Sequence, residues 1–266
     1  MTLSCIQQPH QHLQANLEDG VLTLAMNRAD AKNALYGELY LWIAQALDEA
    51  DASKEVRVVI FRGAENDFTA GNDMKDFMGF IQKPHEGKAG DQPPFVLLKA
   101  AARFSKPLII GVKGVAIGIG VTILLHADIV YADNTALFQI PFVSLGLSPE
   151  GAASRLLVKQ AGYQKAAELL FTAKKFNAAT ALNANLVNDV VEDVYATAQQ
   201  TAQQLAALPL ASLKQTKALM KKDLAEIIAC VDEEAEIFMQ RVRSPEMMEA
   251  VQAFMQKRKP DFSQFN

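Results

Sequence analysis

Residues 107–120, which read PLIIGVKGVAIGIG, decide the fold class of this chain. The first six residues are apolar and predict a buried β-strand that a glycine-rich turn follows. The apolar run that continues to residue 126 predicts a helix, and residues 128–132 (DIVYA) predict a second buried strand. This order of strand, turn, helix and strand is typical of α/β layering.

The rest of the first half continues this alternation. Strands are predicted over residues 20–26, 56–63 and 136–138, and apolar residues at helical spacing predict a helix over residues 35–50. From residue 149 onward the chain is rich in alanine and predicts mainly helices, over residues 152–160, 164–170, 195–205, 210–220, 223–243 and 245–257, with one strand over residues 187–191. The sequence therefore predicts an α/β core with an α-helical tail. Residues 82–94, rich in proline, glycine and charge, predict a mobile loop.

Composition narrows the class of protein. Half of the 266 residues are hydrophobic and 21% are charged, which suits a globular protein with a sizeable core. The net charge of −4 argues against a nucleic-acid surface, and the longest apolar run, residues 115–125, is too short to span a membrane. Two isolated cysteines, Cys5 and Cys230, predict neither a disulfide nor a metal site. The N-terminus shows no signal-peptide pattern, and we expect a cytoplasmic protein.

Two glycine-containing turns are candidates for a site that stabilises negative charge. Residues 68–73 (FTAGND) and 114–120 (GVAIGIG) can each bring a backbone N–H close to a ligand. A single carboxylate follows downstream, Glu150 in residues 148–151 (SPEG). An oxygen that carries charge and one carboxylate that moves a proton are the minimum for enolate chemistry.

Each of these segments also has a purely structural interpretation. The glycines of residues 118–120 would let a helix pack tightly on a strand. Ser148, Pro149 and Glu150 would start a helix, with Ser148 as its cap.

Several segments, in this order, resemble the crotonase family, also called the enoyl-CoA hydratase/isomerase superfamily. They are residues 27–28 (NR), 33–35 (NAL), 68–74 (FTAGNDM), 106–107 (KP), 114–120 and 127–129 (ADI). The resemblance extends from about residue 13 to residue 262. It implies the ClpP/crotonase-like α/β fold of repeated ββα units in two stacked sheets. It also implies a core with the acyl-CoA site over residues 1–200, and a helical trimerisation region over residues 201–266 that assembles a homotrimer or a hexamer.

The resemblance further implies an acyl-CoA thioester as substrate, with no separate cofactor and no metal. The backbone amides of Asn72 and Ile119 would hold the thioester oxygen. The residues expected around the substrate are Ala70, Gly71, Asp73, Met74, Lys75, Lys32 and Gly118. Phe254 and Lys257 resemble a C-terminal pair that reaches the CoA of a neighbouring subunit.

The same family frame separates isomerases from hydratases. Hydratases use two glutamates to activate water, and the aligned positions here hold Thr122 and Phe142, neither of which is a base at neutral pH. The segment around Glu150 is similar to the Δ3,Δ2-enoyl-CoA isomerases, in which the corresponding glutamate takes a proton from C2 and returns it at C4. We expect Glu150 to do this in an apolar pocket, for which the candidate lining is Phe138, Ile140, Phe142, Val143 and Leu147.

Two alternatives stay open. One is another crotonase reaction on a thioester: weak hydration, hydrolysis or decarboxylation. The other is a non-catalytic crotonase that binds acyl-CoA or RNA. Lys214, Lys217 and Lys221 form a helical stripe that could serve RNA, although a solvated helix face is the favoured interpretation.

Overall fold

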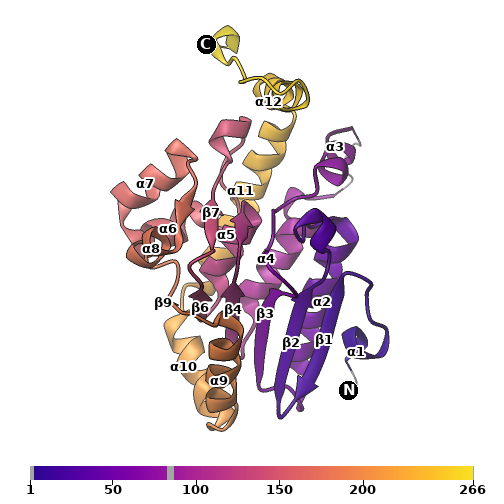
Figure 1. The fold of residues 1–266 in the computed structure, drawn as a ribbon, viewed down its shortest axis with the longest axis vertical. Coiled ribbons are helices and arrows are strands. Elements are labelled where there is room, and N and C mark those ends of the chain that lie inside the picture. Colours follow the sequence, from indigo (N-terminus) through magenta and orange to yellow (C-terminus); the bar gives the residue numbers. More distant parts are fainter. Residues whose placement is uncertain (1–2, 83–86, 266) are drawn as a thin grey trace.

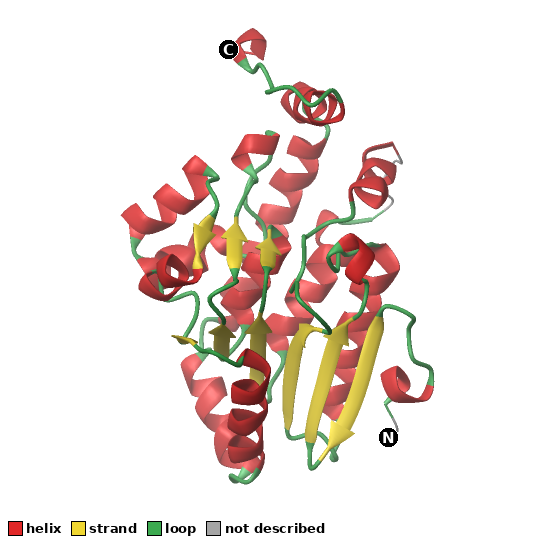
Figure 2. Ribbon diagram, viewed as in Figure 1, coloured by secondary structure: helices red, strands yellow, loops and turns green. Residues whose placement is uncertain are grey.

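The computed structural model describes residues 3–82 and 87–265. Its larger sheet has the strand order β1-β2-β3-β4-β6-β9, with β1 antiparallel to β2 and all other neighbours parallel. These strands are β1 (Leu13–Glu18), β2 (Val21–Met26), β3 (Val58–Gly63), β4 (Leu108–Val112), β6 (Ile129–Ala132) and β9 (Asp189–Val190). The smaller sheet joins β5 (Val115–Ile117), β7 (Leu137–Gln139) and β8 (Phe176–Asn177), and Figure 2 shows it above the larger one.

Helices cover both faces of the larger sheet, which is why its central strands are nearly continuous apolar runs. Helices α2 (Gly37–Ala52) and α4 (Pro93–Arg103) belong to the main core on one face (Figure 1). On the other face, Ala198 and Ala202 of α9 (Val194–Ala206) pack on the outward side chains of β3 and β4. The sheet is therefore the middle of three layers.

The remaining helices follow the strands and close the main core. The shorter ones are α1 (Ser4–Gln7), α3 (Met74–Gln82), α5 (Ile119–Thr122), α6 (Ala153–Ala161), α7 (Tyr163–Thr172) and α8 (Ala178–Asn183). The C-terminal ones are α10 (Leu210–Met220), α11 (Leu224–Val242) and α12 (Pro245–Met255). Short 3-10 turns complete the chain: η1 (Ala29–Ala31), η2 (Ala89–Asp91), η3 (Ile123–His126), η4 (Val143–Leu145) and η5 (Ser263–Phe265). Helix α11 runs beside α4, whereas α12 lies at the end of the molecule away from α1 (Figure 1).

The predicted α/β core with a helical C-terminal region is confirmed, and most predicted elements lie within a few residues of the observed ones. The helix predicted after the glycine-rich turn is α5 followed by η3. Much of the predicted mobile loop is ordered as η2 and the start of α4, while its residues 83–86 lie outside the described residues. The predicted boundary at residue 200 falls inside α9, and residues from both sides of it share one hydrophobic core.

The solvated-face interpretation of the lysine stripe is wrong for Lys217 and Lys221. Lys217 is 9% exposed, and its Nζ donates to the Asp128 carboxylate at 2.6 Å and to the Lys106 carbonyl at 2.7 Å. The Lys221 ammonium donates to the carbonyl of His126 at 3.1 Å. Both lysines therefore anchor α10 to the core. Across the described residues, no helix is long and apolar enough to cross a membrane.

Candidate active site

Backbone pairing brings the two glycine-containing turns together. The N–H of Thr69 donates to the Val115 carbonyl at 2.9 Å, and the N–H of Ile117 donates to the Thr69 carbonyl at 3.0 Å. On its other side the first turn pairs with Leu35. The N–H of Leu35 donates to the Gly71 carbonyl at 2.8 Å, and the N–H of Asp73 donates to the Leu35 carbonyl at 2.7 Å. Three segments that are distant in sequence thus meet at the start of α5.

Gly71 is required by this close approach. Its φ of +84° lies in the region that other residues rarely adopt, and a Cβ there would stand 2.6 Å from the Ile117 carbonyl oxygen. A side chain at this position would push the two turns apart.

Asn72 and Ile119 both line a cavity of about 290 Å³. Leu35 bonds to the residues on either side of Asn72, so the Asn72 N–H points away from that pairing. Ile119 is the first residue of α5, where an N–H has no partner inside the helix. Within the described chain neither N–H meets a protein acceptor. The arrangement can therefore supply two donors to one oxygen.

Glu150 lies in a turn and not in a helix, so the interpretation of residues 148–150 as a helix start is wrong. Gly151 and Ala152 both have positive φ values, 75° and 58°, and α6 begins only at Ala153. These two residues turn the chain so that the Glu150 side chain enters the interior, where it is 4% exposed. The Thr122 hydroxyl donates to its Oε1 at 2.6 Å.

Burial raises the pKa of Glu150 to about 8, because the apolar interior disfavours the carboxylate. The hydrogen bond from Thr122 lowers this pKa, and the nearby Glu234 carboxyl raises it. A carboxyl group poised near neutral pH can both accept and donate a proton.

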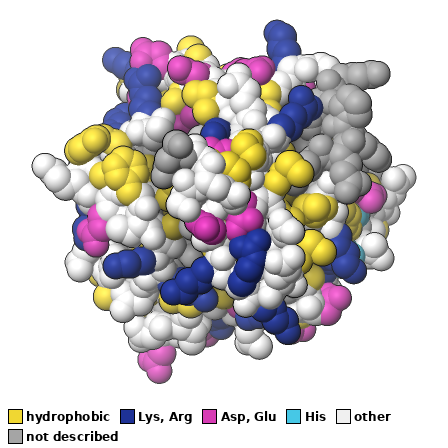
Figure 3. Space-filling model, turned by 90° about the horizontal axis from the view of Figure 1, so that it is seen from above, with side chains coloured by type: hydrophobic (Ala, Val, Ile, Leu, Met, Phe, Trp, Pro, Cys, Tyr) yellow, Lys and Arg dark blue, Asp and Glu magenta, His cyan; other side chains and the backbone are white. Residues whose placement is uncertain are grey.

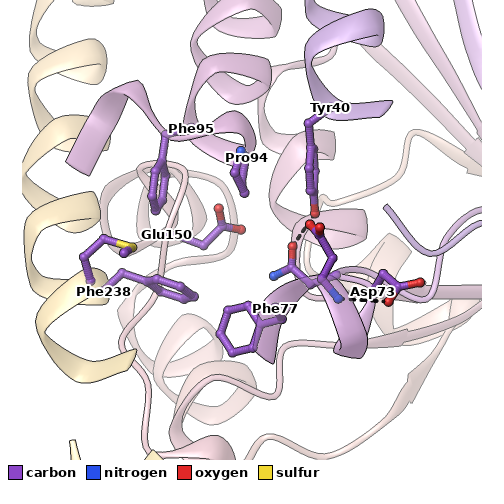
Figure 4. A pocket seen from close by; sticks show the side chains of 10 residues that line it. Tyr40, Asp73, Phe77, Pro94, Phe95, Glu150 and Phe238 are labelled. Carbon is purple, nitrogen blue, oxygen red and sulfur yellow. Dashed lines mark hydrogen bonds between the residues drawn. The ribbon is translucent and has the colours of Figure 1, made fainter. Parts of the chain in front are cut away.

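The Glu150 carboxyl opens into a small inner cavity of about 20 Å³, which has room for about one water molecule. Figure 4 shows Glu150 on one side of this space, Tyr40 on the other, and aromatic side chains around it. The inner cavity adjoins the larger one, because Asn72, Asp73, Phe77 and Phe238 line both. The candidate base and the two amides therefore serve one continuous site.

The predicted lining is correct only in part. Phe142 and Leu147 line the larger cavity. Phe138, Ile140 and Val143 line neither cavity, and Phe138 instead stacks on Phe176 with the ring centroids 5.5 Å apart. The aromatic wall comes mainly from elements that the sequence did not point to: Phe77 of α3, Phe95 of α4 and Phe238 of α11. Phe238 is its centre, with edge-to-face contacts to Phe77, Phe95 and Phe142.

Tyr40 is a further polar residue of the site that sequence reasoning missed. It comes from α2, is 1% exposed, and its hydroxyl donates to Oδ1 of Asn72. Burial raises its pKa well above the usual value, so the hydroxyl keeps its proton. This bond holds the Asn72 side chain in one orientation beside the Glu150 carboxyl. Only the apolar spacing of α2 signals Tyr40, and that pattern is shared by ordinary core residues.

Replacing Tyr40 with phenylalanine is expected to lower kcat about tenfold with little change in KM, because Asn72 and its backbone amide become less well fixed. The free energy of unfolding should fall by about 1 kcal/mol, the usual net value of one hydrogen bond. Steady-state kinetics and thermal melts measure both quantities. The matched control is Tyr36→Phe, which removes a hydroxyl bonded to His12 outside both cavities. Equal effects of the two variants on kcat would contradict the assignment of Tyr40 to the site.

The other predicted substrate residues fall into three groups. Ala70, Gly71, Asp73, Met74 and Gly118 line the larger cavity. Lys75 and Lys32 lie near it on the surface but do not line it, and the Lys32 ammonium is 3.4 Å from the Asp67 carboxylate. Phe254, 69% exposed, and Lys257 lie on α12 and just beyond it, outside both cavities.

Asp73 has a structural role. One of its carboxylate oxygens accepts from Arg28 at 2.7 Å, and the other accepts the backbone N–H groups of Lys75 and Asp76 at the start of α3. These bonds lower the pKa of Asp73 against the opposing effect of its burial. Among the described residues, no cluster of His, Cys, Asp and Glu side chains is placed to hold a metal ion.

Comparison with known proteins shows the family of this chain. The family model "Enoyl-CoA hydratase/isomerase" matches residues 16–265. Enoyl-CoA delta isomerase 2 of Rattus norvegicus is 34% identical over 91% of this chain, which spans 63% of that protein. The 2,3-dehydroadipyl-CoA hydratase of Escherichia coli is 30% identical over 91% of this chain and 94% of its own length.

A crystal structure of an Acinetobacter baumannii protein, assigned to the enoyl-CoA hydratases/isomerases, is 81% identical and superposes with a TM-score of 0.90. The alignment covers 92% of this chain and 99% of that one. The chain therefore belongs to the enoyl-CoA hydratase/isomerase family, the crotonases, whose members act on acyl-CoA thioesters.

Proposed function

We propose that this protein isomerises a 3-enoyl-CoA to the trans-2-enoyl-CoA. The Glu150 carboxylate removes a proton from C2, and the electrons move onto the thioester oxygen to form a dienolate. The N–H groups of Asn72 and Ile119 donate to that oxygen. Glu150, now protonated, delivers the proton to C4, and the double bond moves from C3–C4 to C2–C3.

The observation that carries the proposal is that Glu150 is the one carboxylate lining these cavities, among the described residues, whose charge neither a cation nor a backbone N–H compensates. Asp73 is paired with Arg28, and Asp76 accepts the backbone N–H of Gly37 at 2.9 Å. A proton shuttle needs one such group. The family resemblance aligns Thr122 and Phe142 with the two glutamates of the hydratases, and the Thr122 hydroxyl donates a hydrogen bond to Glu150.

The expected substrate contacts extend this proposal. The larger cavity would take the thioester, and Ala70, Gly71, Asp73, Met74 and Gly118 would line it. Lys32 and Lys75 would meet the CoA phosphates, with CoA as a part of the substrate and not as a cofactor. Figure 3, viewed from the α12 end of the molecule, shows basic, acidic and apolar side chains intermingled. The trimer or hexamer, in which Phe254 and Lys257 would reach a neighbour's CoA, and the cytoplasmic location stay predictions.

Slow hydration is a second candidate, because the inner cavity beside Glu150 has room for about one water molecule. In that reaction Glu150 would activate the water. The described cavity lining holds two other carboxylates, Asp73 and Asp76. Arg28 and the backbone N–H of Gly37 engage them, so neither is available to assist the water.

A paired assay of the purified protein tests the proposal. With 3-hexenoyl-CoA we expect rapid formation of 2-hexenoyl-CoA, and with crotonyl-CoA we expect hydration that is slower by at least about 100-fold, the usual size of one missing acid–base group. Chromatography of the products separates the two reactions. Hydration as fast as isomerisation would favour the second candidate, and inactivity on both substrates would overturn the proposal.

A further inference from the structure

Helix α6, which begins three residues after Glu150, obtains its N-terminal cap from another part of the chain. Its own cap position is Ala152, which has no side-chain acceptor. Glu234 of α11 supplies one instead, because its Oε1 accepts the backbone N–H of Ser154 at 2.9 Å. A carboxylate at this end of a helix is stabilised by the free N–H donors and by the helix dipole.

This cap fixes the segment that carries Glu150. The Glu150 carbonyl accepts the N–H of Ala153 at 3.3 Å, and the Gly151 carbonyl is 2.9 Å from Nε2 of His126. A Cβ at Gly151 would stand 3.2 Å from Leu98 and 3.3 Å from Thr122, so the turn has little space to move. Glu234 holds the α6 end of this turn.

The second carboxylate oxygen of Glu234 shows that the residue does more than cap. Glu234 is 6% exposed, and its Oε2 is buried with no hydrogen-bond partner among the described residues. A charge that is only half compensated in an apolar interior acts on its neighbours over a longer range than a solvated one. The Glu150 carboxyl is such a neighbour, and Glu234 raises its pKa.

We infer that Glu234 is a positioning residue that sets both the place and the charge environment of Glu150. For its kinetic readout this inference rests on the proposed isomerase function. Through Glu234, the C-terminal helix α11 would control the Glu150 carboxyl, which moves the proton in the proposed reaction.

The ionisable groups around this pair leave Glu234 as the main uncompensated charge. They are Tyr40 from α2, Asp73 and Asp76 at the start of α3, Lys99 from α4, His126 from η3, Arg155 from α6, and Cys230 and Glu233 from α11. Tyr40, His126 and Cys230 are neutral near pH 7, because burial raises the pKa of the tyrosine and of the thiol and lowers that of the imidazole to about 4. The remaining groups are paired or lie toward solvent.

Burial raises the pKa of Glu234, and the backbone N–H donors at the start of α6 lower it. Among the described residues, the Glu150 carboxyl has the Thr122 hydroxyl as its hydrogen-bond donor. An ionised Glu234 carboxylate opposes a second negative charge at Glu150.

The test is Glu234→Gln, which keeps an oxygen for the Ser154 N–H and removes the charge. Since Glu150 must be ionised to take the C2 proton, kcat/KM of the unmodified protein should rise with pH up to about 8 and then level off. In the variant the rise of kcat/KM with pH should occur at lower pH. At pH 6.5 the kcat/KM of the variant should therefore be severalfold higher than that of the unmodified protein. A purely structural residue would not produce a gain at low pH.

Two further variants complete the design. Glu234→Ala, which removes the cap as well, should lower kcat about tenfold or more while the KM for the CoA ester changes little. Glu233→Gln removes an equal charge from an exposed position on the same helix and should leave the profile unchanged. The inference is overturned if the Glu234→Gln profile superimposes on that of the unmodified protein, or if Glu233→Gln shifts it equally.

An infrared titration of the buried carboxyl band, assigned with Glu150→Gln, gives the same answer without turnover. A lower midpoint in Glu234→Gln would support the inference even if the protein catalyses a different crotonase reaction, and an unchanged midpoint would overturn it. The failure of the proposed function and the failure of this inference are thus distinguishable.

Discussion

Glu150→Gln is expected to lower kcat for 3-enoyl-CoA isomerisation by about 10²–10⁴-fold, the usual contribution of a general acid–base group. The effect should be at the upper end, because in the proposed mechanism one group performs both proton transfers. Glutamine has nearly the same shape and can still accept the Thr122 hydrogen bond, so the fold and the KM should change little. The measurements are kcat and KM with 3-hexenoyl-CoA, together with a thermal melt.

Asp76→Asn is the matched comparison, since Asp76 lines the same inner cavity but its carboxylate is engaged by the backbone N–H of Gly37. It should retain kcat within about fivefold. Loss of turnover in Asp76→Asn together with survival in Glu150→Gln would mean that the mechanism has the wrong base. Binding of a CoA ester to Glu150→Gln, measured by calorimetry, separates a defect in chemistry from a defect in binding.

Gly71→Ala is expected to lower kcat/KM by about 10²–10³-fold, equal to about 2.7–4 kcal/mol, the usual cost of one lost oxyanion donor. The added Cβ would stand 2.6 Å from the backbone oxygen of Ile117, and backbone cannot give way as a flexible side chain does. The turn must move, and the Asn72 amide moves with it. Glu150 lies in a different segment and keeps its place, so its infrared titration should be unchanged.

The control for backbone strain is Gly162→Ala. Gly162 also has a positive φ, 78°, but a Cβ there meets nothing within 4 Å in the part of the chain that the structure describes. Both variants should lose about 1–3 kcal/mol of stability because alanine is strained at a positive φ, and only Gly71→Ala should lose activity as well. If Gly71→Ala keeps kcat/KM within fivefold while its melt shows a folded protein, the Asn72 amide is not part of the oxyanion site.

The sequence revealed those parts of the site that depend on backbone geometry or on a motif. Gly71 and Gly118 could be identified from the sequence, because a glycine at a turn indicates a backbone conformation that other residues rarely adopt. Both have a positive φ in the structure. Glu150 could be identified from the short segment around it, residues 148–151. Tyr40 and Phe238 look like ordinary core residues of amphipathic helices, and only the tertiary structure turns them toward a cavity.

The errors in the fold have similar causes. Residues 82–94 contain enough proline and glycine to suggest a loop, but Pro93 and Pro94 stand in the first turn of α4, where proline is tolerated. The lysines of α10 looked like a solvated face because lysine is almost always exposed. Lys217 is buried because carbonyl and carboxylate oxygens of the core accept its protons, and these contacts are about 90–110 residues away in sequence.

The position of α11 has a consequence for biosynthesis. This helix supplies Phe238 and Met239 to the inner cavity and Glu234 to the start of α6, yet it is translated after every strand of both sheets. A nascent chain that ends before residue 224 has translated every strand of both sheets, but the apolar side of α4 that α11 covers is bare. Such a chain exposes hydrophobic surface that favours aggregation. The apolar side of α4 is therefore covered only once α11 has been translated.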